Sequence, residues 1–564
     1  MEPTELWEDA ATQAKRKQRK VAWKDSYMRI YGMAPTQRQQ DETGATIVTE
    51  VQCLFCASFG REQQPPAGDA APADEAANED ARKRARKKSS NVKYFVTFRV
   101  DQFTQHLARE HPAKWAAYQE IRKNPDAVAA FFPEPAAPTS VYDESFFFKD
   151  MAPITYQATD GDVLSFREYC ADEFILGKPM HEWCRFAVCF WHGFRSDSSE
   201  SDATIRRPWN VLDDAVLQAK RRIDAAFEFM ELLGLRLFAF QDTDIVPDGH
   251  EHHWDVILPY LQGKMRESSI RCLYGAANLV ANRRYMHGAA TSPSLSVYLE
   301  AAAQVKRAMR LTHLLGGDNF VLWNGRDGAP SLLSTDMAKD DVHYAMFLRM
   351  VVEYKTSLGA TFQLLLKPKP VDPLQPTYDR DVATTLCFLL RHRLQMHFKI
   401  CVSPSSSRAG VEAMHDVAYA SMTKSLGSVD CSIGESYHVL SDAKHAALLM
   451  RTVIQQQGLS PGGLALDIRV RRESTSLKDL VVAHISAMDT LARGLRKAAT
   501  MYLKGELDRK VQARYASWDC QLGRQIEGRD TTFELLATKS ARHEPLASGE
   551  IETFDLLFQR GLSS

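Results

Sequence analysis

The feature that most constrains the fold is an alternation of short apolar runs with longer amphipathic ones, from about residue 141 almost to the end of the chain. The short runs have the length of buried strands, and the stretches between them, such as 211–234 and 296–317, have helical periodicity. Strands that alternate with helices form a parallel sheet, and eight such units close into a barrel. We therefore predict an α/β fold, a (β/α)8 TIM barrel. Its strands are expected at 183–191, 236–240, 271–277, 319–325, 362–368, 398–402, 427–432 and 463–468.

Composition divides the chain into regions. Residues 1–135 are polar with basic patches, and their insert 63–91 is rich in Ala, Pro and acidic residues and then strongly basic. That insert has no apolar face to bury, so we predict disorder there. A linker is expected at 136–143 and the barrel at 144–477. Residues 478–564 are mostly helical and charged in pattern, and we expect them to form a C-terminal arm outside the barrel.

The whole-chain properties point to the cytoplasm or the nucleus. The ten cysteines lie mostly singly in apolar runs, as reduced buried thiols do. The first twenty residues lack the apolar centre of a signal peptide. No run of about 18 uncharged apolar residues occurs, so we expect no membrane association. The formal net charge of −1 gives no bulk attraction to nucleic acid.

Five polar motifs follow one another at the ends of the expected strands. They are FWHGF (190–194), LFAFQDTDIVPDG (237–249), RYMHGAATSP (284–293), LGGDNFVLWNGRDG (315–328) and VRRESTSLKDL (470–480). In sequence and in order they resemble the motifs of the xylose isomerase family, and the resemblance extends over roughly 144–560. The resemblance implies conversion of D-xylose to D-xylulose with two divalent metals, and a homotetramer joined through the C-terminal arm.

The family has seven metal-ligating side chains at the strand ends, and the resemblance implies that most are replaced here. Lys367 stands where the family has a bridging Glu, and Ser403 and Ser406 stand where it has a Glu and a His. The stretch 427–445 lacks the family's pair of Asp residues. Asp430 and Asp467 remain as remnant ligands.

Charge argues against a metal in such a barrel. A divalent cation within a few Å of an ammonium would be repelled by roughly several kcal/mol at an effective dielectric near 20. We therefore expect no Mg²⁺, Mn²⁺ or Co²⁺ in the barrel. Two buried carboxylates without a cation would also repel each other, so Lys367 is predicted to pair with Asp430 and Asp467.

Of the family's catalytic and substrate-binding positions, some carry a different residue here and others keep the family's residue. Gln241 replaces the His that assists ring opening, and an amide cannot act as a base. Asp244, the acidic partner of that His, and Lys369, which aligns with a carbonyl-polarising lysine, are catalytic remnants. Trp191 and Trp323 align with substrate-binding positions, and packing alone would also explain them.

The N-terminal region carries a second motif. Cys53 and Cys56 are followed, after 49 residues, by His106 and His111. Two thiolates and two imidazoles suit tetrahedral zinc, and looping out the insert leaves about 20 residues between the pairs. The region resembles BED-type zinc fingers, which implies DNA binding. The alternative is a lone CxxC with solvent-facing histidines. Basic runs at 15–20 and 82–88 are either phosphate-contacting or simply solvated.

We therefore predict a pseudoenzyme scaffold of the xylose isomerase family, fused to a zinc-binding module with a DNA or protein partner through residues 1–135. Two alternatives remain open. One is an active xylose isomerase with a remodelled site. The other is a metal-free sugar sensor that binds through Trp191 and Trp323.

Overall fold

The computed structural model describes two compact units, Met1–Ser145 and Phe146–Ser564, and each is treated by itself. The predicted insert 63–91, the linker 136–143 and Ser406 lie outside the described residues. Those described are 23–24, 26–40, 46–59, 93–95, 97–122, 131, 147–159, 161–195, 207–210, 214–246, 253–323, 325–372, 375–404, 414–433, 442–471, 473–540 and 548–563.

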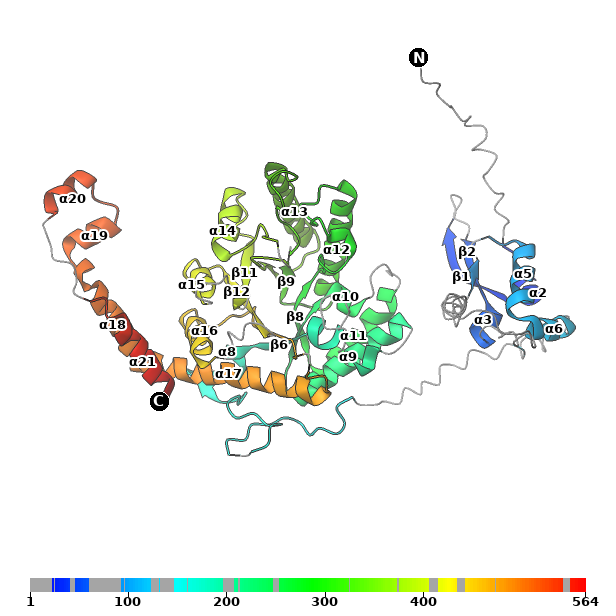
Figure 1. Ribbon diagram of the computed structural model, residues 1–564, viewed down its shortest axis with the longest axis horizontal. Coiled ribbons are helices and arrows are strands. Elements are labelled where there is room, and N and C mark those ends of the chain that lie inside the picture. Colours follow the sequence, from blue (N-terminus) through cyan, green and yellow to red (C-terminus); the bar gives the residue numbers. More distant parts are fainter. Residues whose placement is uncertain are drawn as a thin grey trace, which may run out of the picture. The chain divides into compact units, whose positions relative to one another are not determined.

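The second unit is a closed barrel of eight parallel strands, which confirms the predicted TIM barrel (Figure 1). Every strand pairs with its sequence neighbours, and β13 pairs with β6 to close the ring. The strands are β6 (Phe186–Cys189), β7 (Leu237–Gln241), β8 (Arg271–Ala276), β9 (Asn319–Leu322), β10 (Gln363–Leu366), β11 (Phe398–Val402), β12 (Leu426–Ile433) and β13 (Leu464–Ile468).

These strands are buried on both faces, as expected for a parallel sheet covered by helices. The barrel interior combines small residues such as Ala187, Ala239 and Ala465 with the large rings of Trp191 and Tyr274. The first predicted strand was too long. Met180–Cys184 forms the short helix α8, and Arg185 then takes a left-handed conformation with φ 36° before β6 begins.

Amphipathic helices surround the barrel. Several begin at an Asp whose carboxylate accepts a backbone N–H, including Asp214, Asp381 and Asp442. No described helix is long and apolar enough to cross a membrane. The helices are α9 (Ala215–Leu232), α10 (Asp242–Ile245), α11 (Trp254–Ser268), α12 (Leu295–Leu314), α13 (Met337–Ser357), α14 (Val382–Arg391), α15 (His415–Met422), α16 (Ala443–Gln455) and α17 (Leu477–Lys504).

The helix α17 corrects the expected start of the arm at residue 478. It packs along α16 and β13, and its apolar stripe, including Leu480, Leu491 and Leu495, belongs to the barrel core. Gly494 permits the close contact with α16, because a Cβ there would lie 2.7 Å from the backbone of Ala446. Beyond α17 the chain leaves the barrel as α18 (Glu506–Tyr515), α19 (Gln521–Glu527) and α20 (Phe533–Lys539), and α21 (Ile551–Ser563) returns to α16 and α17 (Figure 1).

His484 of α17 gives the barrel a predictable pH dependence. Its ring packs 4.7 Å from that of Phe229, and burial lowers its pKa from 6.5 to about 4. As the pH falls below 6.5, this histidine is protonated in the unfolded chain but stays neutral in the folded chain until about pH 4. The free energy of unfolding therefore decreases as the pH falls through that interval, by about 3 kcal/mol in total. Denaturant unfolding of His484→Gln should lack this component between pH 6.5 and 4. If the free energy of unfolding of His484→Gln fell as much between pH 6.5 and pH 4 as that of the native chain, the assignment would be contradicted.

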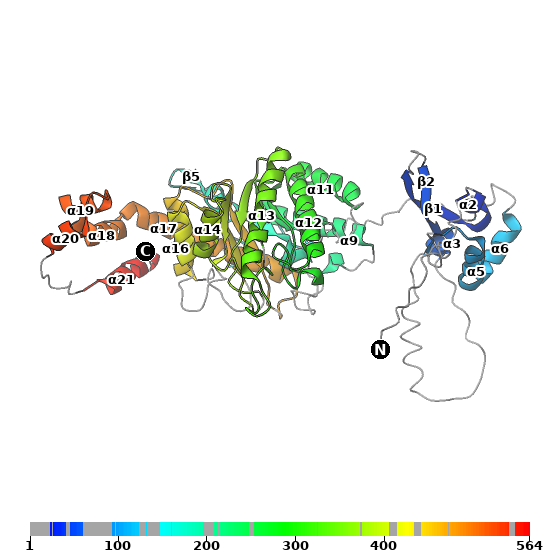
Figure 2. The same ribbon diagram turned by 90° about the horizontal axis from the view of Figure 1, so that it is seen from above.

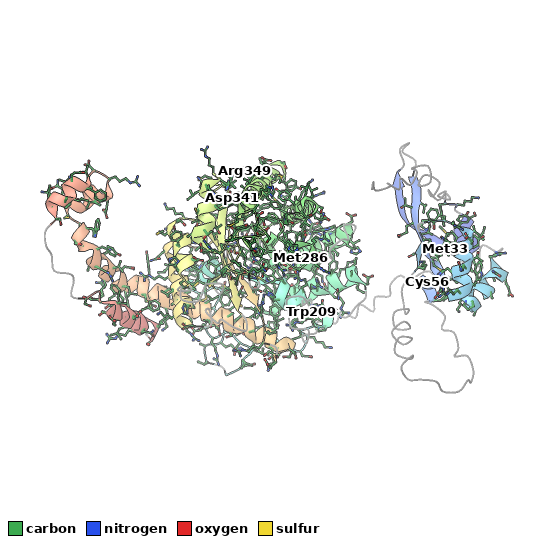
Figure 3. The ribbon with its side chains drawn as sticks, turned by 45° about the horizontal axis from the view of Figure 1, so that its top comes forward. Met33, Cys56, Trp209, Met286, Asp341 and Arg349 are labelled. Atoms are coloured by element: carbon green, nitrogen blue, oxygen red, sulfur yellow. The ribbon has the colours of Figure 1, made fainter. Side chains whose placement is uncertain are left out.

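The first unit is small and aromatic. An antiparallel sheet of β1 (Met33–Gln40), β2 (Thr46–Cys53) and β3 (Tyr94–Phe95) packs with α2 (Ser26–Tyr31), α3 (Leu54–Phe59), α5 (Val100–Glu110) and α6 (Pro112–Ile121). Met33 and Cys56, both labelled in Figure 3, are buried in its core. Trp209, labelled in the same view, belongs to the separate barrel core, where it stacks on Phe194.

Candidate functional site

The barrel site lies where β6, β10, β12 and β13 end, the edge at which barrels of this type place their chemistry. Lys367 directly follows β10, and its ammonium forms an ion pair with Asp430 of β12 inside the barrel. Burial opposes the charge on Lys367, but Asp430, Cys401 and Asp467 outweigh it and raise the pKa of the ammonium. Lys367 therefore carries a fixed positive charge here.

Asp467 is engaged differently from the prediction. Its direct partner is the Nδ1 of His192, which follows β6, and not Lys367. Burial acts against the charged carboxylate, yet His192, Arg469 and Lys367 hold the pKa of Asp467 well below its usual range. The Oγ of Ser432 lies 3.1 Å from a carboxylate oxygen of Asp430 and 3.1 Å from one of Asp467, so the hydroxyl is within donating distance of either carboxylate.

The two tryptophans stand against the lysines. The Nζ of Lys367 is 5.9 Å from the ring centre of Trp191 and 5.5 Å from that of Trp323. The Nζ of Lys369 lies 4.9 Å from Trp323 and donates to Asp372 at 2.8 Å. The indole N–H of Trp323 is buried and has no hydrogen-bond partner among the described residues. The retained tryptophans thus face cations.

Gln241 and Asp244 belong to a buried network that sequence reasoning missed in part. Arg195 forms an ion pair with Asp244 at 3.1 Å and donates to the Oε1 of Gln241 at 3.2 Å. Asn278 donates to the same Oε1 at 2.7 Å, and the backbone N–H of Gln241 donates to Asp244 at 2.7 Å. The available signal was Arg195 itself, which ends the π-helical turn Trp191–Arg195 after β6, because a buried cation requires a nearby acid.

The described side chains of this site do not fit two divalent metals. Asp430 is held by Lys367 and Asp467 by His192, and Ser403 is a buried hydroxyl. Hard cations need several free oxygen ligands, mostly carboxylates. Within the described part of the barrel, no three His, Cys, Asp or Glu residues gather in a metal-holding group. Residues 405–413 and 434–441, which include Ser406, lie outside the described part.

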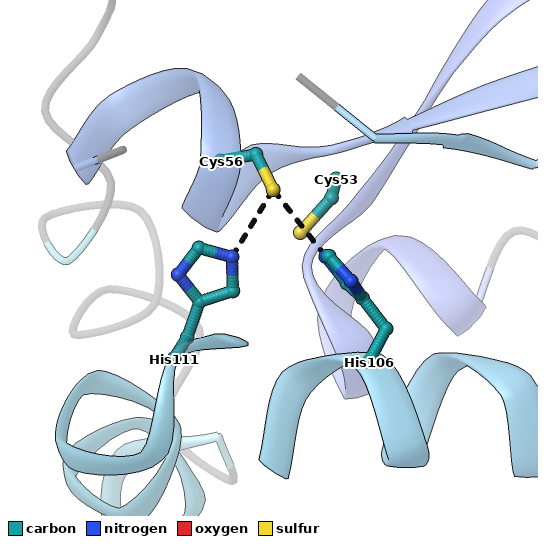
Figure 4. A group of neighbouring side chains, drawn as sticks. All are labelled: Cys53, Cys56, His106 and His111. Atoms are coloured by element: carbon teal, nitrogen blue, oxygen red, sulfur yellow. Dashed lines mark hydrogen bonds between the residues drawn. The ribbon is translucent and has the colours of Figure 1, made fainter. Parts of the chain in front are cut away.

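The first unit does bring four such side chains together, Cys53, Cys56, His106 and His111, with ligand atoms within 4.8 Å of one another (Figure 4). The Sγ of Cys56 lies 3.3 Å from the Nε2 of His106 and 3.1 Å from that of His111. A tetrahedral zinc would separate such ligands by roughly 3.3–3.8 Å. The donor set therefore fits zinc, and the two sulfur–nitrogen distances lie close to this spacing.

The fold explains why these four residues meet. Cys53 ends β2 and Cys56 lies in α3, while His106 is in α5 and His111 joins α5 to α6. Aromatic rings surround them, with Phe95 5.5 Å from His106. The hydrogen bond from Cys53 and the contacts with both histidines hold the pKa of the Cys56 thiol well below its usual range. A thiolate is therefore favoured at this centre before any cation is considered.

Comparison with known proteins identifies the family of the chain. A xylose isomerase of Hordeum vulgare is 41% identical over 436 residues, which cover 74% of this chain and 91% of that protein. One of Arabidopsis thaliana is 39% identical over 74% of the chain and 91% of its own length, and one of Escherichia coli O9:H4 (strain HS) is 36% identical over 70% and 94%. No protein-family model matches the chain.

Among solved structures, a D-psicose 3-epimerase from Clostridium cellulolyticum H10 covers 55% of the chain and 99% of its own length, with a TM-score of 0.39 and 11% identity. An L-ribulose 3-epimerase gives a TM-score of 0.38 at 12% identity, covering 57% of this chain and 97% of its own. The sequence relatives, with the eight-stranded barrel, show that the chain belongs to the xylose isomerase family.

Proposed function

We propose that the chain is a pseudoenzyme, a xylose isomerase barrel that has given up metal binding and catalysis and serves as a scaffold. The observation that carries this proposal is the ion pair between Lys367 and Asp430 in the barrel interior. It puts a fixed ammonium where the family resemblance implies a metal-bridging carboxylate. Because the cation is internal and covalent, no exchangeable metal is needed to balance the remaining carboxylates.

The same substitution removes the chemistry of the reaction. The metals of the family supply Lewis acidity to the sugar oxygens. Here Lys367 repels a metal, and the family's ring-opening His is the amide of Gln241, whose oxygen is already bonded by Arg195 and Asn278. Asp244 is held by Arg195. The remaining candidate, Lys369, is bonded to Asp372. Each of these three family positions, Gln241, Asp244 and Lys369, is therefore engaged by a neighbouring side chain.

The test is turnover and metal response of the full chain. With D-xylose and Mg²⁺, Mn²⁺ or Co²⁺, we expect no D-xylulose above a protein-free control, and no metal-dependent rise in the Tm of the barrel. A xylose isomerase relative assayed in parallel serves as the positive control. Metal-dependent production of D-xylulose would refute the proposal and favour the remodelled active isomerase.

The N-terminal unit is proposed to be a zinc-binding, BED-like module that binds DNA or a protein partner. The support is the group of four ligand atoms, and the basic runs at 15–20 and 82–88 add charge for phosphate contacts. Salt-dependent binding of duplex DNA by the full chain, with a slope that falls when these runs are neutralised, would distinguish DNA from a protein partner. A cytoplasmic or nuclear location accords with either partner.

The C-terminal arm is proposed to hold a homotetramer together. Its helices expose large apolar side chains, including Tyr515, Trp518 and Phe533. Such residues outside a core mark an association surface.

Sugar sensing remains a second candidate, favoured by the buried, unpartnered indole N–H of Trp323 among the described residues. D-Xylose that raises the Tm without any metal would support it.

A further inference from the structure

A groove lies on the outer flank of the barrel, and its lining shares no residue with the ion-paired barrel site. It has a volume of about 620 Å³ and is lined by consecutive helices α11 and α12 and by Tyr354 of α13. Figure 2 shows these three helices along one flank of the barrel. Its apolar part is formed by Trp254, Leu258 and Leu311. This is the size and character of pockets that accept a large side chain.

One rim of the groove is strongly positive. Lys306, Arg307 and Arg310 all lie on the same face of α12 within little more than one helical turn, and all three line the groove. Asp255 is the only acidic residue among the lining residues that the structure describes. Lys306 and Arg310 are exposed, and neither forms an ion pair with a described residue. The Nζ of Lys306 instead lies 5.6 Å from the ring centre of Tyr354.

We propose that this groove docks an acidic segment of a partner protein, which inserts a leucine or aromatic side chain between α11 and α12 and sets carboxylates against Lys306 and Arg310. In peptide-binding grooves, most of the binding energy commonly comes from an apolar side chain buried in a pocket, and charged residues line the rim. Crowded like charges on α12 repel one another, and carboxylates would relieve that repulsion.

Two other occupants fit less well. A nucleic acid presents a row of phosphates. The side chains of Trp254 and Leu258 on the apolar floor give those phosphates no cation to bind. A second copy docked face to face about a two-fold axis would set the basic rim against itself. An acidic, amphipathic peptide complements both the floor and the rim.

The experiment uses the full chain and a fluorescein-labelled helical peptide that carries leucine and tryptophan on one face and glutamate beside them. Fluorescence anisotropy should give saturable binding. The double variant Lys306→Glu/Arg310→Glu should weaken it by roughly tenfold or more, since both changes place like charges against the peptide. Lys339→Glu, an exposed charge reversal on α13 outside the groove, should change it by less than about twofold.

A charge-swapped peptide, with lysine for glutamate, should bind the double variant more tightly than the native chain. The proposal is overturned if the double variant binds the acidic peptide as the native chain does. It is equally overturned if a peptide with alanine in place of leucine and tryptophan binds as well, since the groove would then hold no anchor. Duplex DNA should also be tested as a competitor of the acidic peptide. If DNA competes with the peptide as well on the Lys306→Glu/Arg310→Glu variant as on the native chain, the result would count against a groove site.

Discussion

Replacement of Lys367 by methionine is expected to lower the free energy of unfolding of the barrel by about 3–5 kcal/mol. The side chain of Asp430 is fully buried, and Lys367 is its ion-pair partner. Methionine keeps most of the volume but removes the charge, which leaves the buried Asp430 carboxylate without a cation as its partner. Urea unfolding of the full chain, followed by far-UV circular dichroism, measures the loss.

The matched control is Lys369→Met, two residues away. Lys369 also pairs with an acid, Asp372, but its own side chain is 31% exposed and Asp372 keeps Arg326 as a second partner, so the cost should be about 0–1 kcal/mol. Burial raises the pKa of Asp430 and Lys367 opposes that shift, so without Lys367 the carboxyl should protonate more readily. The deficit of Lys367→Met should therefore shrink as the pH falls. If Lys367→Met and Lys369→Met lost equal free energy of unfolding, the buried ion pair would stabilise the barrel no more than the exposed one.

Lys367→Glu extends the same test toward the family's chemistry. A glutamate beside Asp430 and Asp467 creates a group of buried carboxylates that repel each other, so the variant should be less stable than the native chain in chelator. Mn²⁺ or Co²⁺ should then restore several degrees of Tm to this variant and none to the native chain. A native chain that responds as strongly as the variant would contradict the assignment of Lys367 as an internal cation.

Loss of one of the four proposed zinc ligands is expected to unfold the whole N-terminal unit. The buried core of that unit is a small aromatic cluster, and binding free energies of structural zinc in finger peptides are roughly 10–16 kcal/mol. Cys56→Ser should abolish zinc in the purified full chain and the hydrogen-exchange protection of α5 and α6, while the protection of the barrel strands stays unchanged. Elemental analysis and hydrogen exchange by mass spectrometry give the two readouts.

Cys387→Ser is the control for this experiment, because Cys387 is an exposed cysteine on α14 of the barrel. It should leave both the zinc content and the exchange pattern unchanged. A native chain without zinc, or a Cys56→Ser chain with full protection of α5 and α6, would refute the zinc module. The second outcome would leave the aromatic cluster around Phe55 and Phe103 as the sole source of its stability.

Local pattern determined the barrel. Each apolar run is short, bounded and separated from the next by a helical stretch, so the number of strands and their parallel pairing followed from periodicity. The same reasoning misplaced the arm. Charged residues dominate the exposed face of α17, and only its packing against α16 reveals the buried stripe.

The sequence by itself determined which residue types stand at the ends of the strands, including the lysine among remnant carboxylates. It could not decide their pairing. Only the tertiary structure assigned Asp430 to Lys367, gave Asp467 to His192, and placed Arg195 between Gln241 and Asp244. The physical reason is that these partners come from segments far apart in the chain, 275 residues apart for His192 and Asp467, and a buried charge is stabilised by the partner that lies next to it in space.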